Sequence, residues 1–82
     1  MGEKQNILIT GAASGIGRVS ALRMAKAHHV IVADRDGDGA GAVTSEIVAA
    51  GGTATAIAVD VSDGASVRAM KAQIETDIGP VL

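Results

Sequence analysis

Apolar residues gather in three short runs along the chain, with longer segments of mixed polarity between them. The runs cover residues 7–9, 30–33 and 56–59. Each run is continuous rather than alternating, which is typical of strands that helices cover on both faces of a parallel sheet. The pattern therefore predicts three buried strands.

Between the runs, apolar residues recur at helical spacing and predict helices. The first predicted helix begins after the first run and extends to Ala27. The second covers residues 39–50 and ends at Gly51-Gly52, after a flexible acidic turn at 36–39.

A third predicted helix follows the third run. We expect Ser62 to be its N-cap, with Asp63 in the first turn. Gly79-Pro80 ends it. The residues of its predicted apolar face are Val67, Met70, Ile74 and Ile78.

Strands and helices thus alternate along the chain, as in right-handed βαβ crossovers. We expect an α/β fold: a truncated, doubly wound Rossmann unit (βαβαβα) of three layers with a parallel sheet. It is predicted to occupy residues 1–82 as one partial domain, with no second domain and with Val81-Leu82 starting a fourth strand. The first strand would then keep an unpaired edge in the doubly wound order. Self-association is expected through that edge.

Composition and charge exclude several classes of function. The chain has no Cys, so it has no disulfides or zinc–thiolate sites. His28 and His29 are adjacent, and we interpret them as a solvated turn rather than metal ligands. A formal net charge of −2 and the lack of Phe, Tyr and Trp disfavour nucleic acid as a partner. Without a membrane-spanning apolar stretch or a signal-peptide core, a cytoplasmic protein is expected.

A glycine-rich loop follows the first run, with the sequence TGAASGIG from Thr10 to Gly17. We expect Gly11 to let the chain turn where a side chain would be in the way, and Gly15 to let backbone approach a pyrophosphate. Gly17 is expected to let the next helix pack closely against the sheet. That helix then offers unpaired N–H groups to phosphates. A purely structural turn is the alternative, but the strand before and the helix after favour nucleotide binding. Residues 1–82 are therefore predicted to be a partial dinucleotide-binding (Rossmann) domain.

This loop, with Val-Ala-Asp-Arg at 32–35 and Val-Asp-Val-Ser at 59–62, is similar to the short-chain dehydrogenases/reductases. The resemblance covers residues 7–82. It implies an NAD(P)-dependent oxidoreductase that transfers hydride between a nicotinamide cofactor and an alcohol or carbonyl substrate. The loop residues expected to bind the cofactor are Gly11, Ser14, Gly15, Ile16 and Gly17.

Asp34, at the end of the second predicted strand, favours NAD over NADP. A carboxylate there can accept hydrogen bonds from the ribose hydroxyls and would repel a 2′-phosphate. Arg35 opposes this choice, because the following position in this family can carry a basic residue that holds the 2′-phosphate. An exposed Asp that begins a turn is the alternative interpretation.

Three further roles come from the resemblance. It implies that the Asp60 carboxylate accepts the adenine amino group, with the backbone of Val61 beside it. It also implies that Ile16 gives its N–H to the pyrophosphate and lies toward the nicotinamide. A helix-capping acid is the alternative for Asp60, and a plain core position is the alternative for Ile16.

The segment at 25–30 departs from the family pattern, because it lacks the usual Gly before the second strand. We therefore expect either a frayed helix or a left-handed His28 or His29.

Catalytic and metal-binding residues are not expected in this chain. The family's catalytic Ser, Tyr and Lys lie beyond the matching part, and this chain has no Tyr. Ser66 and Lys71 are interpreted as solvated positions of the third helix. The chain alone is predicted to be inactive. The alternative is a stand-alone, non-catalytic nucleotide-binding or dimerising module.

Overall fold

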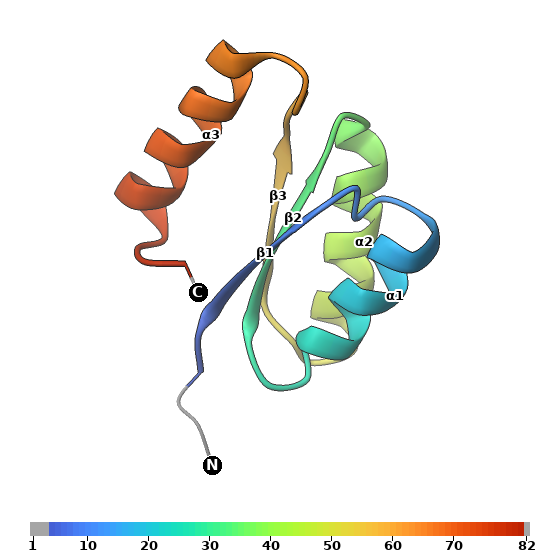
Figure 1. Cartoon of the computed structure of the whole chain (residues 1–82). Coiled ribbons are helices and arrows are strands. Elements are labelled where there is room, and N and C mark those ends of the chain that lie inside the picture. Colours follow the sequence, from blue (N-terminus) through green and yellow to red (C-terminus); the bar gives the residue numbers. More distant parts are fainter. Residues whose placement is uncertain (1–3, 82) are drawn as a thin grey trace.

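A computed structural model describes residues 4–81, which form strands and helices in strict alternation (Figure 1). The strands are β1 (Asn6–Thr10), β2 (His29–Asp34) and β3 (Ala54–Ala58). The helices are α1 (Gly15–Met24), α2 (Gly37–Ala49) and α3 (Gly64–Asp77). The predicted order of elements is confirmed.

The strands form one parallel sheet in the order β1-β2-β3. Helices α1 and α2 cover one face of this sheet, and α3 lies on the other (Figure 1). The predicted three-layer α/β Rossmann unit is therefore confirmed. Within the described residues, β1 is an edge strand, paired with β2 alone. Val81 is not in a strand, and Leu82 lies outside the described residues.

Strand β2 supplies the core on both faces of the sheet. Val30 and Val32 are fully buried against α1 and α2, while Ile31 and Ala33 are fully buried on the α3 side. A central strand buried on both faces explains the continuous apolar run at 30–33. Helix α3 adds its predicted face, with Met70 and Ile74 buried and Val67 and Ile78 partly buried.

Two helices begin differently from the sequence-based expectation. Helix α2 starts at Gly37, because the Asp36 carboxylate accepts the Gly39 N–H at 2.9 Å and acts as its N-cap. The acidic segment at 36–39 is thus mostly helical, not a flexible turn. Asp63, not Ser62, caps α3 by accepting the Ala65 N–H at 3.0 Å.

The connection from α1 to β2 also corrects an expectation. Helix α1 ends at Met24, whose carbonyl accepts the His28 N–H at 3.0 Å. No non-glycine residue among those described has a positive φ, so neither histidine adopts the left-handed conformation. His29 begins β2 and lies 3.0 Å from the hydroxyls of both Thr53 and Thr55, so it is not in a solvated turn.

Residues 4–81 lack two kinds of feature, a membrane-spanning helix and a cluster of metal ligands. None of the helices has both the length and the apolar character needed to cross a membrane. The same part of the chain contains no group of three or more His, Asp or Glu side chains that could hold a metal ion.

Candidate functional site

The glycine-rich loop turns the chain from β1 into α1. Gly11 and Gly15 have φ values of 66° and 60°, which only glycine adopts without strain. A Cβ at either position would meet nothing within 4 Å. The expectation that a side chain at Gly11 would be in the way is therefore wrong, since backbone conformation requires glycine there.

Gly17 is the loop glycine that close packing requires. A Cβ at this position would overlap the carbonyl oxygen of Gly11 and lie 3.1 Å from the Cα of Ala12. The first turn of α1 thus rests against the loop itself. Sequence reasoning correctly expected a close approach at Gly17 but placed it against the sheet.

The N-terminus of α1 is open and carries no negative charge. Ser14 is extended at the N-cap position, its side chain makes no capping hydrogen bond, and the first turn holds no acidic residue. The backbone N–H groups of this turn are therefore available to an anion, and the helix dipole favours one. Ile16 is 86% exposed, so it is not a core residue in this structure.

The Asp34 carboxylate ties the glycine-rich loop to the end of β2. Its Oδ2 accepts the Ala13 N–H, and its Oδ1 accepts the Asp36 N–H, each at 2.9 Å. These two backbone donors, Asp36 first and then Ala13, hold the pKa of the Asp34 carboxyl below its usual value. The carboxylate is therefore ionised at neutral pH.

Asp60 follows β3 and is held by two serines. Its Oδ1 accepts the Ser62 hydroxyl at 2.6 Å and the Ser62 N–H at 3.0 Å. Its own N–H donates to the Ser66 Oγ at 3.0 Å, so Ser66 is not simply a solvated position. The Ser62 hydroxyl, followed by the Ser62 N–H and the charge of Arg35, lowers the pKa of Asp60.

Arg35 and Asp60 approach each other across the carboxyl end of the sheet. The Arg35 Nη2 lies 3.9 Å from the Asp60 Oδ2, and the Arg35 side chain is 81% exposed. An ion pair this long and exposed contributes little to stability.

These elements enclose a cavity of about 260 Å³ at the carboxyl ends of the strands. The residues that line it are Gly11, Asp34, Arg35, Val59, Asp60, Val61 and Ser62. The structure thus brings together five of the nine predicted site residues, and the other four (Ser14, Gly15, Ile16 and Gly17) lie on the adjoining loop and first turn of α1. Sequence reasoning missed Ser62 as part of the site, because it was assigned to the cap of α3.

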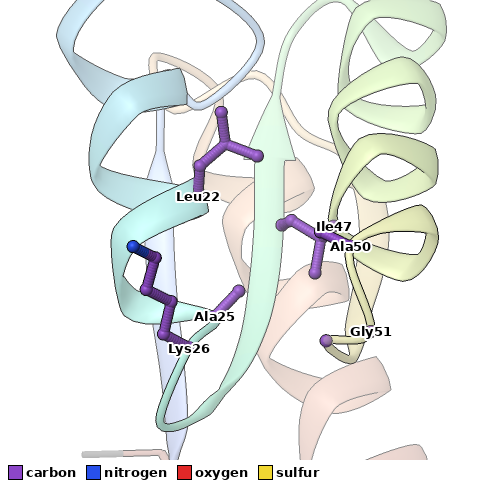
Figure 2. A pocket seen from close by; sticks show the side chains of 7 residues that line it. Leu22, Ala25, Lys26, Ile47, Ala50 and Gly51 are labelled. Atoms are coloured by element: carbon purple, nitrogen blue, oxygen red, sulfur yellow. The ribbon is translucent and has the colours of Figure 1, made fainter.

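Another cavity lies between the ends of α1 and α2, with Leu22 and Ile47 on its two sides, both on the same face of β2 (Figure 2). Its volume is about 400 Å³. It lies away from the glycine-rich loop, where the strands begin, and none of the predicted site residues lines it. The helices that form it are joined nearer the loop by a bidentate pair between Arg18 and Glu46.

Comparison with known proteins assigns the chain to a family. The model of the short chain dehydrogenase family matches residues 5–82. A 3beta-hydroxysteroid dehydrogenase of Mediterraneibacter gnavus is 37% identical over 78 residues, which are 94% of this chain and 28% of that protein. The structure of a hydroxysteroid dehydrogenase from Escherichia coli matches with a TM-score of 0.92 and 32% identity, over 96% of this chain and 34% of that one.

Two further structures of similar fold contain nicotinamide cofactors. A metagenomic short-chain oxidoreductase in complex with NADP matches with a TM-score of 0.90 and 32% identity, over 96% of this chain and 36% of that one. A D-mannonate oxidoreductase candidate from Haemophilus influenza with bound NAD matches with a TM-score of 0.90 and 30% identity, over 96% of this chain and 29% of that one. The chain therefore spans only 28–36% of the length of these four proteins. It belongs to the short-chain dehydrogenase family of oxidoreductases, with the NAD(P)-binding Rossmann fold of that family.

Proposed function

We propose that this chain binds NAD as the cofactor-binding part of a short-chain dehydrogenase/reductase. The protein would transfer hydride between the nicotinamide and an alcohol or carbonyl substrate. The observation that carries this proposal is the ionised Asp34 carboxylate, bonded to the loop and lining the cavity beside Gly11.

The pyrophosphate is assigned to the loop and the first turn of α1. The pyrophosphate would approach the loop backbone at Gly11, Ser14 and Gly15, and Gly17 keeps the first turn of α1 close to the loop. The N–H of Ile16 would bind a phosphate oxygen, and its exposed side chain would lie toward the nicotinamide. No cationic side chain is needed for this, because the helix N-terminus itself favours an anion.

The choice of NAD over NADP rests on two properties of the Asp34 carboxylate, its unused hydrogen-bond acceptor sites and its negative charge. Its two oxygens already accept one backbone N–H each, but a carboxylate has about four acceptor sites. It can therefore also accept the ribose hydroxyls. Two like charges about 4 Å apart repel by roughly 1 kcal/mol even in water, so a 2′-phosphate is disfavoured.

The adenine is assigned to the end of β3. Asp60 would accept the adenine amino group through its carboxylate, with the backbone of Val61 alongside. Both residues line the same cavity as Asp34 and Arg35. The Arg35 Nη2 lies 3.9 Å from the Asp60 Oδ2, so Arg35 is directed toward the proposed adenine site.

The test is a titration of the 82-residue chain with NAD, NADP and AMP, following thermal unfolding by circular dichroism. A ligand that binds only the folded state stabilises it by about 2.7 kcal/mol at a hundredfold excess over Kd. We expect NAD and AMP to raise Tm, and NADP to raise it less. A larger shift with NADP, or none with any nucleotide, would contradict the proposal.

Asp34→Asn provides the matching variant. Removal of the charge is expected to reduce the preference for NAD over NADP about fivefold, from the repulsion of roughly 1 kcal/mol. Asp38→Asn is the control, because Asp38 is an exposed residue in the first turn of α2 and does not line the cavity. An unchanged preference in Asp34→Asn would refute the role of this carboxylate.

We also propose self-association through the open edge of β1. An apolar groove of about 370 Å³ adjoins this strand, lined by residues that include Leu8, Met70, Ile74 and Val81. Val81 is 38% exposed, so Val81→Glu should weaken association at little cost to folding. Sedimentation equilibrium measures this, with Val48→Glu on α2 as the control. A monomer at every concentration would contradict the proposal.

A further inference from the structure

Asp60 has two carboxylate oxygens in very different surroundings. Oδ1 accepts two hydrogen bonds from Ser62, from its hydroxyl at 2.6 Å and its N–H at 3.0 Å. One carboxylate oxygen has about two acceptor sites, so Oδ1 is fully used. Oδ2 has the Arg35 Nη2 at 3.9 Å, which is beyond hydrogen-bonding distance.

The backbone of Asp60 is fixed as well. Its N–H donates to the Ser66 Oγ at 3.0 Å, which ties the segment after β3 to the first turn of α3. The carboxylate is thus held by Ser62 on one side and by its own anchored backbone on the other. Only Oδ2 retains free acceptor capacity toward the cavity that Asp60 helps to line.

Ser62 has no other structural task that would explain its side chain. Asp63 is the N-cap of α3, and among residues 4–81 the only hydrogen bond found for the Ser62 hydroxyl is the one to Asp60. Ser62 is exposed and lines the cavity itself. An exposed hydroxyl directed at a carboxylate restricts the rotation of that carboxylate, since the bond fixes its plane.

We propose that Ser62 is a positioning residue that sets selectivity for an adenine base, by fixing Asp60 with one oxygen used and the other facing the amino group. This inference rests on the proposed binding of NAD at this site. An amino group donates to Oδ2, whereas a base with a carbonyl oxygen at the same position would place two acceptors against each other. The site should therefore distinguish adenine from hypoxanthine.

The expected ratio of the two affinities follows from the negative charge of the Asp60 carboxylate, which accepts the hydrogen bond. A hydrogen bond to a charged group contributes more than a neutral one, and a missing donor leaves an acceptor unpaired. We expect NAD to bind at least about tenfold more tightly than nicotinamide hypoxanthine dinucleotide, which differs from it only in the base. Arg35 is too distant and too exposed to compete strongly for Oδ2.

The experiment measures the affinities of the 82-residue chain for NAD and for the hypoxanthine analogue, by calorimetric titration. Ser62→Ala should reduce the ratio of the two affinities several-fold, because the carboxylate keeps only the bond from the backbone N–H of residue 62 and turns more easily. Ser62→Thr keeps the hydroxyl and should retain the ratio. Ser45→Ala is the matched control, because Ser45 is exposed on α2 and does not line the cavity.

Each result has a separate meaning. A ratio that falls in Ser62→Ala and is retained in Ser62→Thr supports the inference. If NAD binds but Ser62→Ala weakens both cofactors by the same factor, or changes neither, Ser62 does not set base selectivity and the inference is overturned while the proposed function stands. If neither dinucleotide binds the unsubstituted chain, both are overturned.

Discussion

Gly17 and Gly41 allow the packing of the cofactor loop to be measured against a matched control. Both are helical glycines, in α1 and α2. A Cβ at Gly17 would overlap the carbonyl oxygen of Gly11 and lie 2.8 Å from its carbonyl carbon, whereas a Cβ at Gly41 would meet nothing within 4 Å. Substitution by alanine therefore adds the same methyl group to a crowded site and to an open one.

The magnitude follows from two opposing effects. Each Gly→Ala change gains up to about 1 kcal/mol of helix propensity. At Gly17 the methyl group also displaces backbone atoms, and such overpacking costs typically about 1–3 kcal/mol. Because the propensity gain is common to both variants, we expect Gly17→Ala to be less stable than Gly41→Ala by about 1–3 kcal/mol.

Thermal unfolding followed by far-ultraviolet circular dichroism gives the comparison. For a domain of this size, 1 kcal/mol shifts Tm by roughly 4–8 °C. Gly41→Ala should therefore raise Tm by up to roughly 4–8 °C above that of the unsubstituted chain, and Gly17→Ala should fall at least roughly 4 °C below Gly41→Ala. Equal Tm values for the two variants would show that the first turn of α1 does not press on the loop, and the packing argument would fail.

Three other changes test the helix cap, the core and the site acid. Asp36→Ala removes the acceptor of the Gly39 N–H, and loss of this cap should lower the free energy of unfolding in urea by about 0.5–2 kcal/mol. Ile47→Ala should cost about 2–5 kcal/mol in the same assay because Ile47 is 1% exposed, whereas Val48→Ala at a 56% exposed position should change it by roughly 0.5 kcal/mol or less. The folded-state pKa of Asp34 lies below its ordinary value of 3.8, so its stabilising contribution is present above that pH and is lost as pH falls through the lowered pKa. The Tm of the unsubstituted chain should therefore decline as the pH falls below about 3.8, and the Tm of Asp34→Asn should decline less steeply. An identical decline in the two proteins would contradict a stabilising role for the Asp34 carboxylate.

The fold could be predicted because the chain repeats one strong pattern. The buried run at 30–33 and the helical spacing that follows it leave few alternatives to a parallel sheet with helices on both faces. The glycine-rich loop was identifiable for the same reason, since its position between a strand and a helix restricts its role. Asp34 and Asp60 could be placed near each other because the carboxyl ends of parallel strands meet at one edge, whereas the role of Asp60 was implied only by the family resemblance.

Local hydrogen bonding was much harder to predict. Ser62 and Asp63 are both good capping residues, and sequence alone does not decide between them. The structure assigns the cap to Asp63 because the Ser62 hydroxyl is bonded to Asp60. Similarly, the bond from the Ala13 N–H to Asp34 joins residues far apart in sequence and leaves no local signal.

The first helix shows a different limit of sequence reasoning. Its apolar spacing predicts a helix to Ala27, but α1 ends at Met24. The N–H groups of Lys26 and Ala27 bond to carbonyls three residues back, which tightens the chain into a turn. This turn needs no residue in the left-handed conformation. The chain therefore reaches β2 without a glycine, which the sequence pattern did not indicate.

The order of the strands in the sheet bears on how the chain folds. Each strand pairs with the strand that precedes it in sequence, so every crossover closes a loop of moderate length. Such pairing has a lower contact order than a parallel sheet that joins strands distant in sequence, and it should therefore fold faster than such a sheet. During synthesis, β1, α1 and β2 can therefore assemble first, and β3 then adds to the pair of strands that already exists.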